Sequence, residues 1–349
     1  MMMDFDIQVL HSVKESERAT WEKLGHGMPF SSYTWYHFGE TVMRDCEPVY
    51  ILLLNDKELV ARATFWVIRN EPLPISWKPL RQIIQGVIRH RPLFVCRSPL
   101  ANTSGLILPE GALRQPALDQ IIEAAKLEAK KSSASFLMFD YMKEDDCNIN
   151  RWPGYFSVFS FSDSGTKMKI FWPDFNQYLA DLKPKVRKHY RQYQREAEVS
   201  GIRIIQQNTV TDINAALDLI RNVEQRHHSA PNPWVKNLLK NANQLDAVWL
   251  TARQGDRLIG CELILVDNGT QMVTALGMAK EFPHVYFLLG YADIRLAIEG
   301  KREFIAWGSG AFETKKRLGF ELEHDNRVVF AGITPLFRAI SGLAAYIGT

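Results

Sequence analysis

Cysteine is scarce in this sequence, and its positions form no pattern. The four cysteines, Cys46, Cys96, Cys147 and Cys261, lie far apart, and none belongs to a C-x-x-C pair. Zinc sites and disulfide frameworks both need cysteines at recognisable spacings. We therefore expect no metal site and no disulfide framework, and a reducing, cytoplasmic compartment.

Long apolar runs are missing as well. A membrane-spanning helix needs about 20 predominantly apolar residues, and no stretch approaches that length. The first ten residues, MMMDFDIQVL, include acidic residues and lack the apolar core of a secretory signal. We expect a soluble protein that touches, at most, the inner face of a membrane.

The rest of the composition is that of a globular protein. The chain has 349 residues, of which 46% are hydrophobic and 23% charged, and this length suits two domains better than one. The net charge of +3 is too small for a protein that coats nucleic acid, yet Lys and Arg gather within 78–91 and 183–195. Local basic patches therefore indicate partners better than the total charge does.

The first half of the chain shows a strand, helix, helix, hairpin order. Alternation and turn residues predict strands at 5–10, 49–54 and 58–67, helices at 16–24 and 35–43, and later a helix at 113–131 and a strand at 135–141. The basic segment 70–110 contains repeated prolines. Since proline breaks helices and central strands, we expect this segment to be an insertion.

The second half mixes helices and strands in a similar way. The predicted helices are 178–199, 212–226, 234–241 and 287–299, and the predicted strands are 202–206, 247–253, 258–266, 271–277 and 304–307. We expect the boundary between the halves at 160–168. The apolar residues 328–347 would form a last strand and helix over the sheet, or a tail that touches a membrane.

Two motifs in the second half carry a resemblance to a known family. One is WGSGAFETKKRLGF at 307–320, and the other is a basic helix, YLADLKPKVRKHYR, at 178–191. A weaker match is PFSSYTWY at 29–36. In this order the motifs resemble the FemAB-like branch of tandem GNAT-fold acyltransferases and aminoacyltransferases, which includes CelD/BioF2-like acetyltransferase-type domains.

The resemblance implies a fold and an activity. The fold would be α+β, with two tandem GNAT-like (acyl-CoA N-acyltransferase) domains, each a mixed, mostly antiparallel sheet flanked by helices. Residues 1–165, with the insertion 70–110, would form the first domain, and 166–349 would form the second and carry the active site. The activity would be transfer of an acyl or aminoacyl group to an amine, in cell-envelope, lipid or polysaccharide biosynthesis.

The same resemblance suggests the groups that act on the donor. Lys315 matches the family's lysine in a K-x-x-x-G pattern ending at Gly319, where it would polarise the carbonyl, and Lys316 would replace it if the register is shifted by one. The alternative for both is a solvated run of charges. Arg187 and Arg191, at i and i+4 on one helix face, would bind phosphate, or would simply form a solvated face.

Several side chains are candidates for moving the proton or binding substrate. Glu262 lies on a predicted central strand, while His284 and Tyr286 lie where the helix of the first motif begins. Strand alternation alone does not decide which face of the sheet Glu262 occupies. Further candidate bases are Glu313, His227 and His228, and the two adjacent histidines lack a third ligand at metal-site spacing.

The loop before that helix bears on the identity of the donor. Simple acetyltransferases of this fold grip the pyrophosphate of coenzyme A with a glycine-rich loop, whereas this chain reads AKEFPHVYFLLG at 279–290. The expected cosubstrate is acyl-CoA or another acyl thioester, with aminoacyl-tRNA and a Fem-type peptide ligase as the alternative. The acceptor would be a small or lipid-linked amine. A protein that keeps the fold and binds a ligand without turnover is a third reading.

One predicted helix suggests contact with lipid. Residues 79–91, PLRQIIQGVIRHR, place isoleucine and valine along one side and three arginines outside it. Such a helix suits the headgroup region of an anionic membrane. It could equally pack on its own domain.

Overall fold

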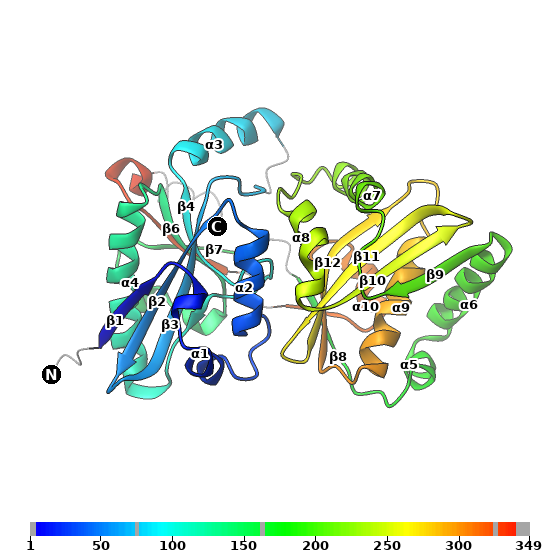
Figure 1. Cartoon of the computed structure of the whole chain (residues 1–349), viewed down its shortest axis with the longest axis horizontal. Helices are drawn as coiled ribbons and strands as arrows, with labels where there is room; N and C mark the ends of the chain where they lie inside the picture. The colour runs from blue at the N-terminus through cyan, green and yellow to red at the C-terminus, as the bar shows by residue number, and fades with distance from the viewer. Residues whose placement is uncertain (1–4, 74–76, 161–164, 324–326, 340–349) are drawn as a thin grey trace. The chain divides into compact units, whose positions relative to one another are not determined.

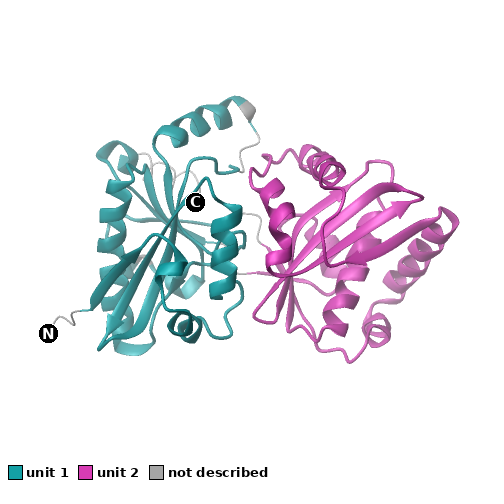
Figure 2. Cartoon of the chain, viewed as in Figure 1, with its two compact units in different colours: residues 1–164, 324–349 teal, residues 165–323 magenta. Residues whose placement is uncertain are grey.

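The computed structural model describes residues 5–73, 77–160, 165–323 and 327–339. The chain forms two compact units, one made of Met1–Ser164 with His324–Thr349 and the other of Gly165–Glu323 (Figure 2). Each unit contains one mixed sheet with helices on its faces (Figure 1). The predicted α+β class is therefore confirmed.

The sheet of the first unit has the strand order β1-β2-β3-β4-β6-β15-β7, with β5 paired to β3. Its strands are β1 (Asp6–Leu10), β2 (Glu47–Asn55), β3 (Glu58–Ile68), β4 (Leu93–Cys96), β5 (Leu106–Ile107), β6 (Phe136–Met142), β7 (Ser157–Ser160) and β15 (Arg327–Gly332). All described pairs are antiparallel except β4 with β6. The helix that connects this parallel pair is α4 (Arg114–Lys131).

Two layers of helix enclose this sheet. The other helices of the unit are α1 (Arg18–Leu24), α2 (Tyr33–Val42) and α3 (Lys78–His90), with short 3-10 turns η1 (Val13–Glu15), η2 (Gly111–Leu113), η3 (Glu144–Cys147) and η4 (Ile149–Arg151). The apolar face of α4 packs on one side, where Phe65 and Phe94 stack with centroids 4.5 Å apart. Burial of this stripe explains why the helical period at 113–131 predicts the element.

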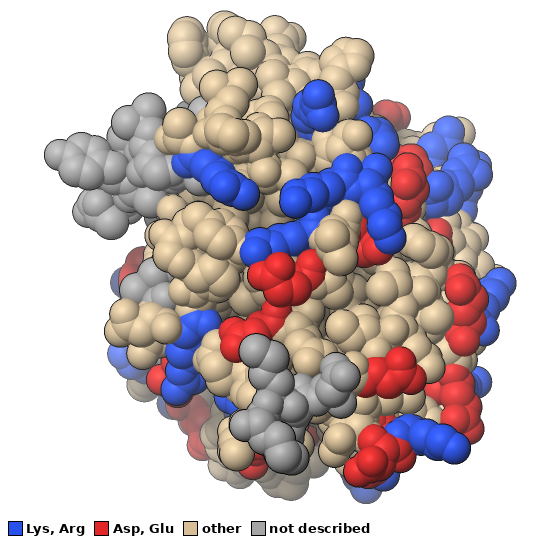
Figure 3. All heavy atoms as spheres, turned by 90° about the vertical axis from the view of Figure 1, so that its left-hand side faces the viewer, with Lys and Arg blue, Asp and Glu red and all other residues tan. Residues whose placement is uncertain are grey.

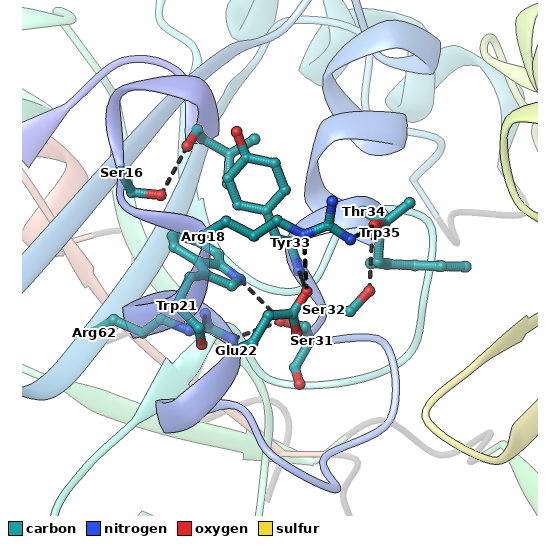
Figure 4. A network of polar contacts seen from close by, with 11 residues as sticks. Ser16, Arg18, Trp21, Glu22, Ser31, Ser32, Tyr33, Thr34, Trp35 and Arg62 are labelled. Atoms are coloured by element: carbon teal, nitrogen blue, oxygen red, sulfur yellow. Dashed lines mark hydrogen bonds and ion pairs between the residues drawn. The ribbon is translucent and has the colours of Figure 1, made fainter.

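The aromatic segment between α1 and α2 holds these helices to the sheet (Figure 4). The guanidinium of Arg62, on β3, is buried and lies 3.9 Å from the centroid of the Trp21 ring. Arg62 Nη2 and Trp21 Nε1 both donate to the carbonyl of Ser31, at 2.7 and 3.0 Å. Ser32 Oγ caps α2 by accepting from the backbone N–H of Trp35 at 3.0 Å. The weaker motif at 29–36 is thus a structural anchor in this unit.

The sheet of the second unit has the order β14-β8-β13-β12-β11-β10-β9. Its strands are β8 (Thr166–Lys169), β9 (Ile202–Gln207), β10 (Asp246–Gln254), β11 (Arg257–Asp267), β12 (Thr270–Met278), β13 (Phe304–Trp307) and β14 (Glu321–Leu322). Its helices are α5 (Phe175–Asp181), α6 (Pro184–Val199), α7 (Ile213–Arg226), α8 (Val235–Asn241) with the turn η5 (Ala242–Gln244), α9 (Val285–Glu299) and α10 (Phe312–Arg317). Only the β12–β13 pair is parallel among the described pairs of this sheet, and α9 connects it.

The first unit takes its strand β15 from the part of the chain that follows the second unit. In the first unit β15 lies between β6 and β7, and in the second unit β8 lies between β13 and β14. Strand β8 follows β7 along the chain but joins the second sheet, while β15 returns from the second half to the first sheet. The structure therefore differs from the division into 1–165 and 166–349, because 327–332 pairs with β6 and β7. The rest of the apolar stretch, 340–347, lies outside the described residues.

The segment 70–110 is more than an insertion. It contains α3 and also β4, whose four residues are all buried between β3 and β6. The prediction of an interruption was wrong at this point because Pro92 and Pro99 flank a very short apolar strand. Proline outside the strand ends does not disturb its hydrogen bonds.

Candidate active site

The sheet of the second unit opens between β12 and β13. These strands pair only where Thr270, Gln271 and Met272 face Phe304, Ile305 and Ala306. Beyond this point β12 runs on to Met278, whereas β13 ends at Trp307. Helix α9 crosses from one strand to the other, so its inner face borders the opening.

The side of the sheet that faces α9 can be read from a glycine. A Cβ at Gly260, on β11, would lie 2.3 Å from Val285 and 3.3 Å from Leu289 of α9. Side chains two residues apart on a strand share a face. Glu262 therefore points toward α9, and it is only 3% exposed. This contact shows which face of the sheet Glu262 occupies, which strand alternation alone did not decide.

On α9, three positions at helical spacing face β13. They are Tyr286, Gly290 and Asp293, and a Cβ at Gly290 would lie 2.8 Å from Cη2 of Trp307. Trp307 Nε1 donates to Asp293 Oδ2 at 2.6 Å. Gln271 Nε2 donates to Asp293 Oδ1 at 2.5 Å and to the backbone carbonyl of Asp293 at 3.0 Å.

Burial controls the titration of the two carboxyl groups. Asp293 is fully buried, and this raises its pKa to about 7 although hydrogen bonds from Trp307 and Gln271 lower it. Burial also raises the pKa of Glu262 well above its usual value, and the negative charge of Asp293 raises it further. Since the two acids oppose each other's ionisation, they titrate as a pair that holds one proton over a wide pH range.

Nε2 of His284, at the start of α9, is buried without a hydrogen-bond partner among the described residues. The same holds for two atoms at the carboxyl pair, Glu262 Oε1 and the hydroxyl of Tyr286. Burial, with the charge of Glu262 second, raises the pKa of Tyr286, so its hydroxyl stays a proton donor at neutral pH. Unpaired buried polar atoms are rare in native proteins, because each costs about 1–3 kcal/mol. The unpaired atoms of Glu262 and Tyr286, which lie with Asp293, mark this opening as the candidate active site.

Lys315 does not present an exposed cation, contrary to expectation. It lies in α10 and is 5% exposed, and its Nζ donates to the carbonyls of Gly308, in a short contact, and of Ser309, at 3.3 Å. The ammonium thus holds the turn that follows Trp307. Lys316 is the exposed neighbour, with its Nζ 5.7 Å from the Phe312 ring centroid.

The two arginines expected to bind phosphate have different surroundings. Arg187 is half-buried, and its Nη1 donates to the carbonyls of Ala180 at 2.6 Å and Leu182 at 2.7 Å. It therefore fastens the start of α6 to the end of α5. Arg191, one turn later, is exposed. Both arginines lie on α6, as expected, but Arg187 is engaged in hydrogen bonds to the backbone before that helix.

Sequence reasoning missed Asp293, Gln271 and Trp307. A signal for Asp293 was present, since Leu289 and Ala297 lie four residues to either side of it on an apolar helix face. The other candidate bases, Glu313, His227 and His228, are exposed. In the part of the chain that the structure describes, no group of three His, Cys, Asp or Glu side chains is arranged to hold a metal ion.

Comparisons with known proteins agree with this architecture. Residues 184–316 match the family model described as the acetyltransferase (GNAT) domain. A search of curated proteins found no significant match. None of the helices within the described ranges is long and apolar enough to cross a bilayer.

Solved structures resemble the chain across both units. FemX is 11% identical, with a TM-score of 0.63, 96% of this chain covered and 100% of FemX. A tandem GNAT protein from the clavulanic acid biosynthesis pathway is 12% identical, with a TM-score of 0.58 and coverage of 95% and 99%. The C-terminal domain of a putative lysylphosphatidylglycerol synthetase from Agrobacterium fabrum is 10% identical, with a TM-score of 0.51 and coverage of 97% and 99%. At these identities the likeness concerns the fold, and it extends over the whole chain.

Proposed function

We propose that this chain, a FemAB-like tandem GNAT-fold protein as its motifs predict, is an N-acyltransferase that works at the opening between β12 and β13. It would move an acyl or aminoacyl group from an activated donor to an amine. The observation that carries this proposal is the pair of unpaired buried polar atoms on Glu262 and Tyr286 beside a second carboxyl group, that of Asp293.

Acyl transfer to an amine needs a group that accepts a proton and a donor that stabilises an oxyanion. The Glu262–Asp293 pair retains a high proton affinity at neutral pH because it is buried and its two charges oppose each other. The pair takes the proton that the attacking nitrogen loses. The un-ionised hydroxyl of Tyr286 can donate to the oxyanion.

The reaction then balances within this site. The amine nitrogen forms a bond to the acyl carbon, and the bond from that carbon to the sulfur or oxygen of the donor breaks. The proton from the nitrogen passes to the carboxyl pair and leaves with the thiol or hydroxyl. His284 is the alternative proton acceptor, since its Nε2 lacks a partner in the described structure. Lys315 acts as a positioning residue that holds the turn after Trp307.

The preferred donor is an acyl-CoA or another acyl thioester, and the match of residues 184–316 to a family model described as an acetyltransferase (GNAT) domain supports this choice. The acceptor would be a small or lipid-linked amine in cell-envelope, lipid or polysaccharide biosynthesis. That assignment places the protein in the cytoplasm, at the inner side of the membrane. Phosphate groups of the donor would meet Arg191 and Lys316, which are exposed.

Aminoacyl-tRNA is the second candidate donor, and one observation favours it. Four exposed cations, Lys185, Lys188, Arg191 and Arg195, follow one another along α6 at spacings of three to four residues. Such a row spans about 15 Å at 1.5 Å per residue, which suits an extended polyanion better than a single pyrophosphate. The alternative outside the enzymes is a protein that keeps the fold and binds either donor without turnover.

Donor protection distinguishes these proposals. The melting temperature would be measured with acetyl-CoA, longer acyl-CoAs, and charged or uncharged tRNA, because a ligand that binds only the folded state stabilises it. We expect one donor class to protect the wild type. Glu262→Gln should keep this protection and lose turnover with an amine, and Lys240→Met, on α8, serves as an exposed control in the same unit. Protection without turnover for every donor and amine tested would support the binding protein instead.

A further inference from the structure

Helix α3 of the first unit carries an exposed apolar stripe. Trp77, Leu80, Ile83 and Val87 are 65, 38, 66 and 43% exposed. Their spacing of three to four residues places them along one side of the helix and its first turn. In Figure 3 the uppermost part of the molecule, which α3 forms in Figure 1, is mostly uncharged surface with Lys and Arg side chains beside and below it.

The helix hardly packs on its own unit. Ile88 is the one residue of α3 that is buried among those whose side chains are described. A Cβ at Gly86 would meet open space. The expectation that α3 packs on its own domain therefore does not account for the stripe. Contiguous exposed apolar surface of this kind marks an interaction site.

The charged residues of this segment of the sequence have a single sign. The same segment contributes Arg81, Arg89 and Arg91, and the sequence contains no Asp or Glu between Glu71 and Glu110. Glu71 itself is bound in two hydrogen bonds, at 2.6 and 2.9 Å, by Arg97. No acidic group of this stretch is therefore left to balance the arginines.

We propose that α3 docks the protein on an anionic lipid bilayer. The segment combines an apolar stripe that begins with a tryptophan and several arginines. This combination suits the boundary between acyl chains and negatively charged headgroups. Two copies of α3 facing each other would bring like charges together without an acid to pair them. Nucleic acid would leave the apolar stripe exposed. The bilayer satisfies both the apolar and the basic residues, independently of what the second unit catalyses.

Vesicle flotation of the full chain tests this proposal. The vesicles would be neutral phosphatidylcholine alone or with about a third phosphatidylglycerol. One variant replaces Trp77, Ile83 and Val87 by serine, and another replaces Arg81, Arg89 and Arg91 by serine. The control replaces Leu127 and Phe171, which are 59 and 68% exposed outside α3, by serine. Because α3 packs so little, unchanged circular dichroism and melting would verify that the variants fold.

The wild type and the control should float with anionic vesicles and much less with neutral ones. Each arginine near an anionic surface is worth about 1 kcal/mol, or about fivefold in partitioning, so the triple arginine variant should bind about 100-fold more weakly. The apolar variant should stay unbound at any salt concentration. Equal flotation of the apolar variant and wild type, or no flotation of wild type, would overturn the proposal.

A second readout separates lipid from self-association. The four native cysteines are buried, so a cysteine placed at Val87 can be labelled selectively with a polarity-sensitive dye. Its emission should shift to the blue when anionic vesicles are added, while sedimentation without lipid shows a monomer. A blue-shifted dimer in the absence of lipid, abolished by the apolar substitutions, would assign the stripe to a second copy and contradict the proposal.

Discussion

Trp307 donates its indole N–H to Asp293 Oδ2 across 2.6 Å, in a site where Glu262 Oε1 has no hydrogen-bond partner among the described residues. Asp293 also accepts from Gln271. Two donors stabilise the ionised form of Asp293, and Glu262 lacks such help. We infer that the proton of the pair rests mainly on Glu262 and that the negative charge rests on Asp293.

This asymmetry predicts a pH-dependent stability difference for Glu262→Gln. The pKa of Glu262 is raised in the folded state. The stability that its protonated form contributes is complete below its unfolded pKa, about 4.3, and is lost as the pH rises from there toward the folded pKa. The free energy of unfolding that is lost amounts to about 1.4 kcal/mol for each unit by which the pKa is raised. Glutamine does not ionise, so the variant avoids this loss. Urea unfolding at pH 4.5 and pH 8 should show that the free energy of unfolding of the variant, relative to wild type, is higher at pH 8 than at pH 4.5. A stability difference that does not change with pH would refute this.

The two arginines of α6 should respond differently to truncation. Arg187→Ala removes the donor that binds the carbonyls of Ala180 and Leu182. We expect a loss of about 1–2 kcal/mol in the free energy of unfolding. Arg191→Ala, the matched control on the same exposed helix, should change stability by less than about 0.5 kcal/mol and weaken donor binding at low salt. Equal stability losses would show that the contacts of Arg187 are unimportant.

Lys315 and Lys316 form a second matched pair. Lys315→Met leaves the carbonyls of Gly308 and Ser309 without their buried donor and should cost about 1–3 kcal/mol. Lys316→Met should leave the free energy of unfolding nearly unchanged, because Lys316 is exposed. If Lys315 only positions the turn, kcat of its variant should recover as the temperature is lowered. A loss of about 10²- to 10³-fold at every temperature would instead indicate direct contact with the reacting carbonyl.

The position of β15 in the first sheet predicts the effect of shortening the chain. A chain ending at Glu323 lacks β15, which lies between β6 and β7 in the first sheet. Its Val328, Val329 and Ala331 are buried, so their removal should unfold the first unit while the second keeps its sheet. A chain ending at Ala339 retains β15 and should keep the first unit folded. Limited proteolysis would show which unit is cleaved, and a protected first unit in the shorter chain would disprove the role of β15.

Local patterns explain which parts of the fold were predictable. Helices α4 and α9 follow from apolar spacing and from the residues that end them, because these signals act within a few turns. The return of β15 to the first sheet was not predictable, since its partners β6 and β7 are far away in sequence. Strand β4 was missed because its prolines stand just outside a four-residue run.

The candidate site was predictable only in part. Glu262 was expected on a central strand, and His284 and Tyr286 at the start of the following helix. The structure places Glu262 and Tyr286 with Asp293, which was not expected. Lys315 was expected to be exposed because runs of cations usually are. Its ammonium is buried instead because the turn at 308–310 offers carbonyls to it, a geometry that involves positive φ angles at Gly310 and Ala311.

The most direct test of the central claim is the pH dependence of product formation by wild type and Glu262→Gln, with the donor that protects the protein and a panel of amines. Release of thiol, or deacylation of tRNA, would be followed from pH 5.5 to 9. We expect kcat/KM of the wild type to rise with pH through about 7, where the carboxyl pair loses a proton. Glu262→Gln should lose about 10²- to 10⁴-fold in kcat. Turnover by Glu262→Gln equal to that of the wild type, with the same pH profile, would contradict the assignment of acyl transfer to this site.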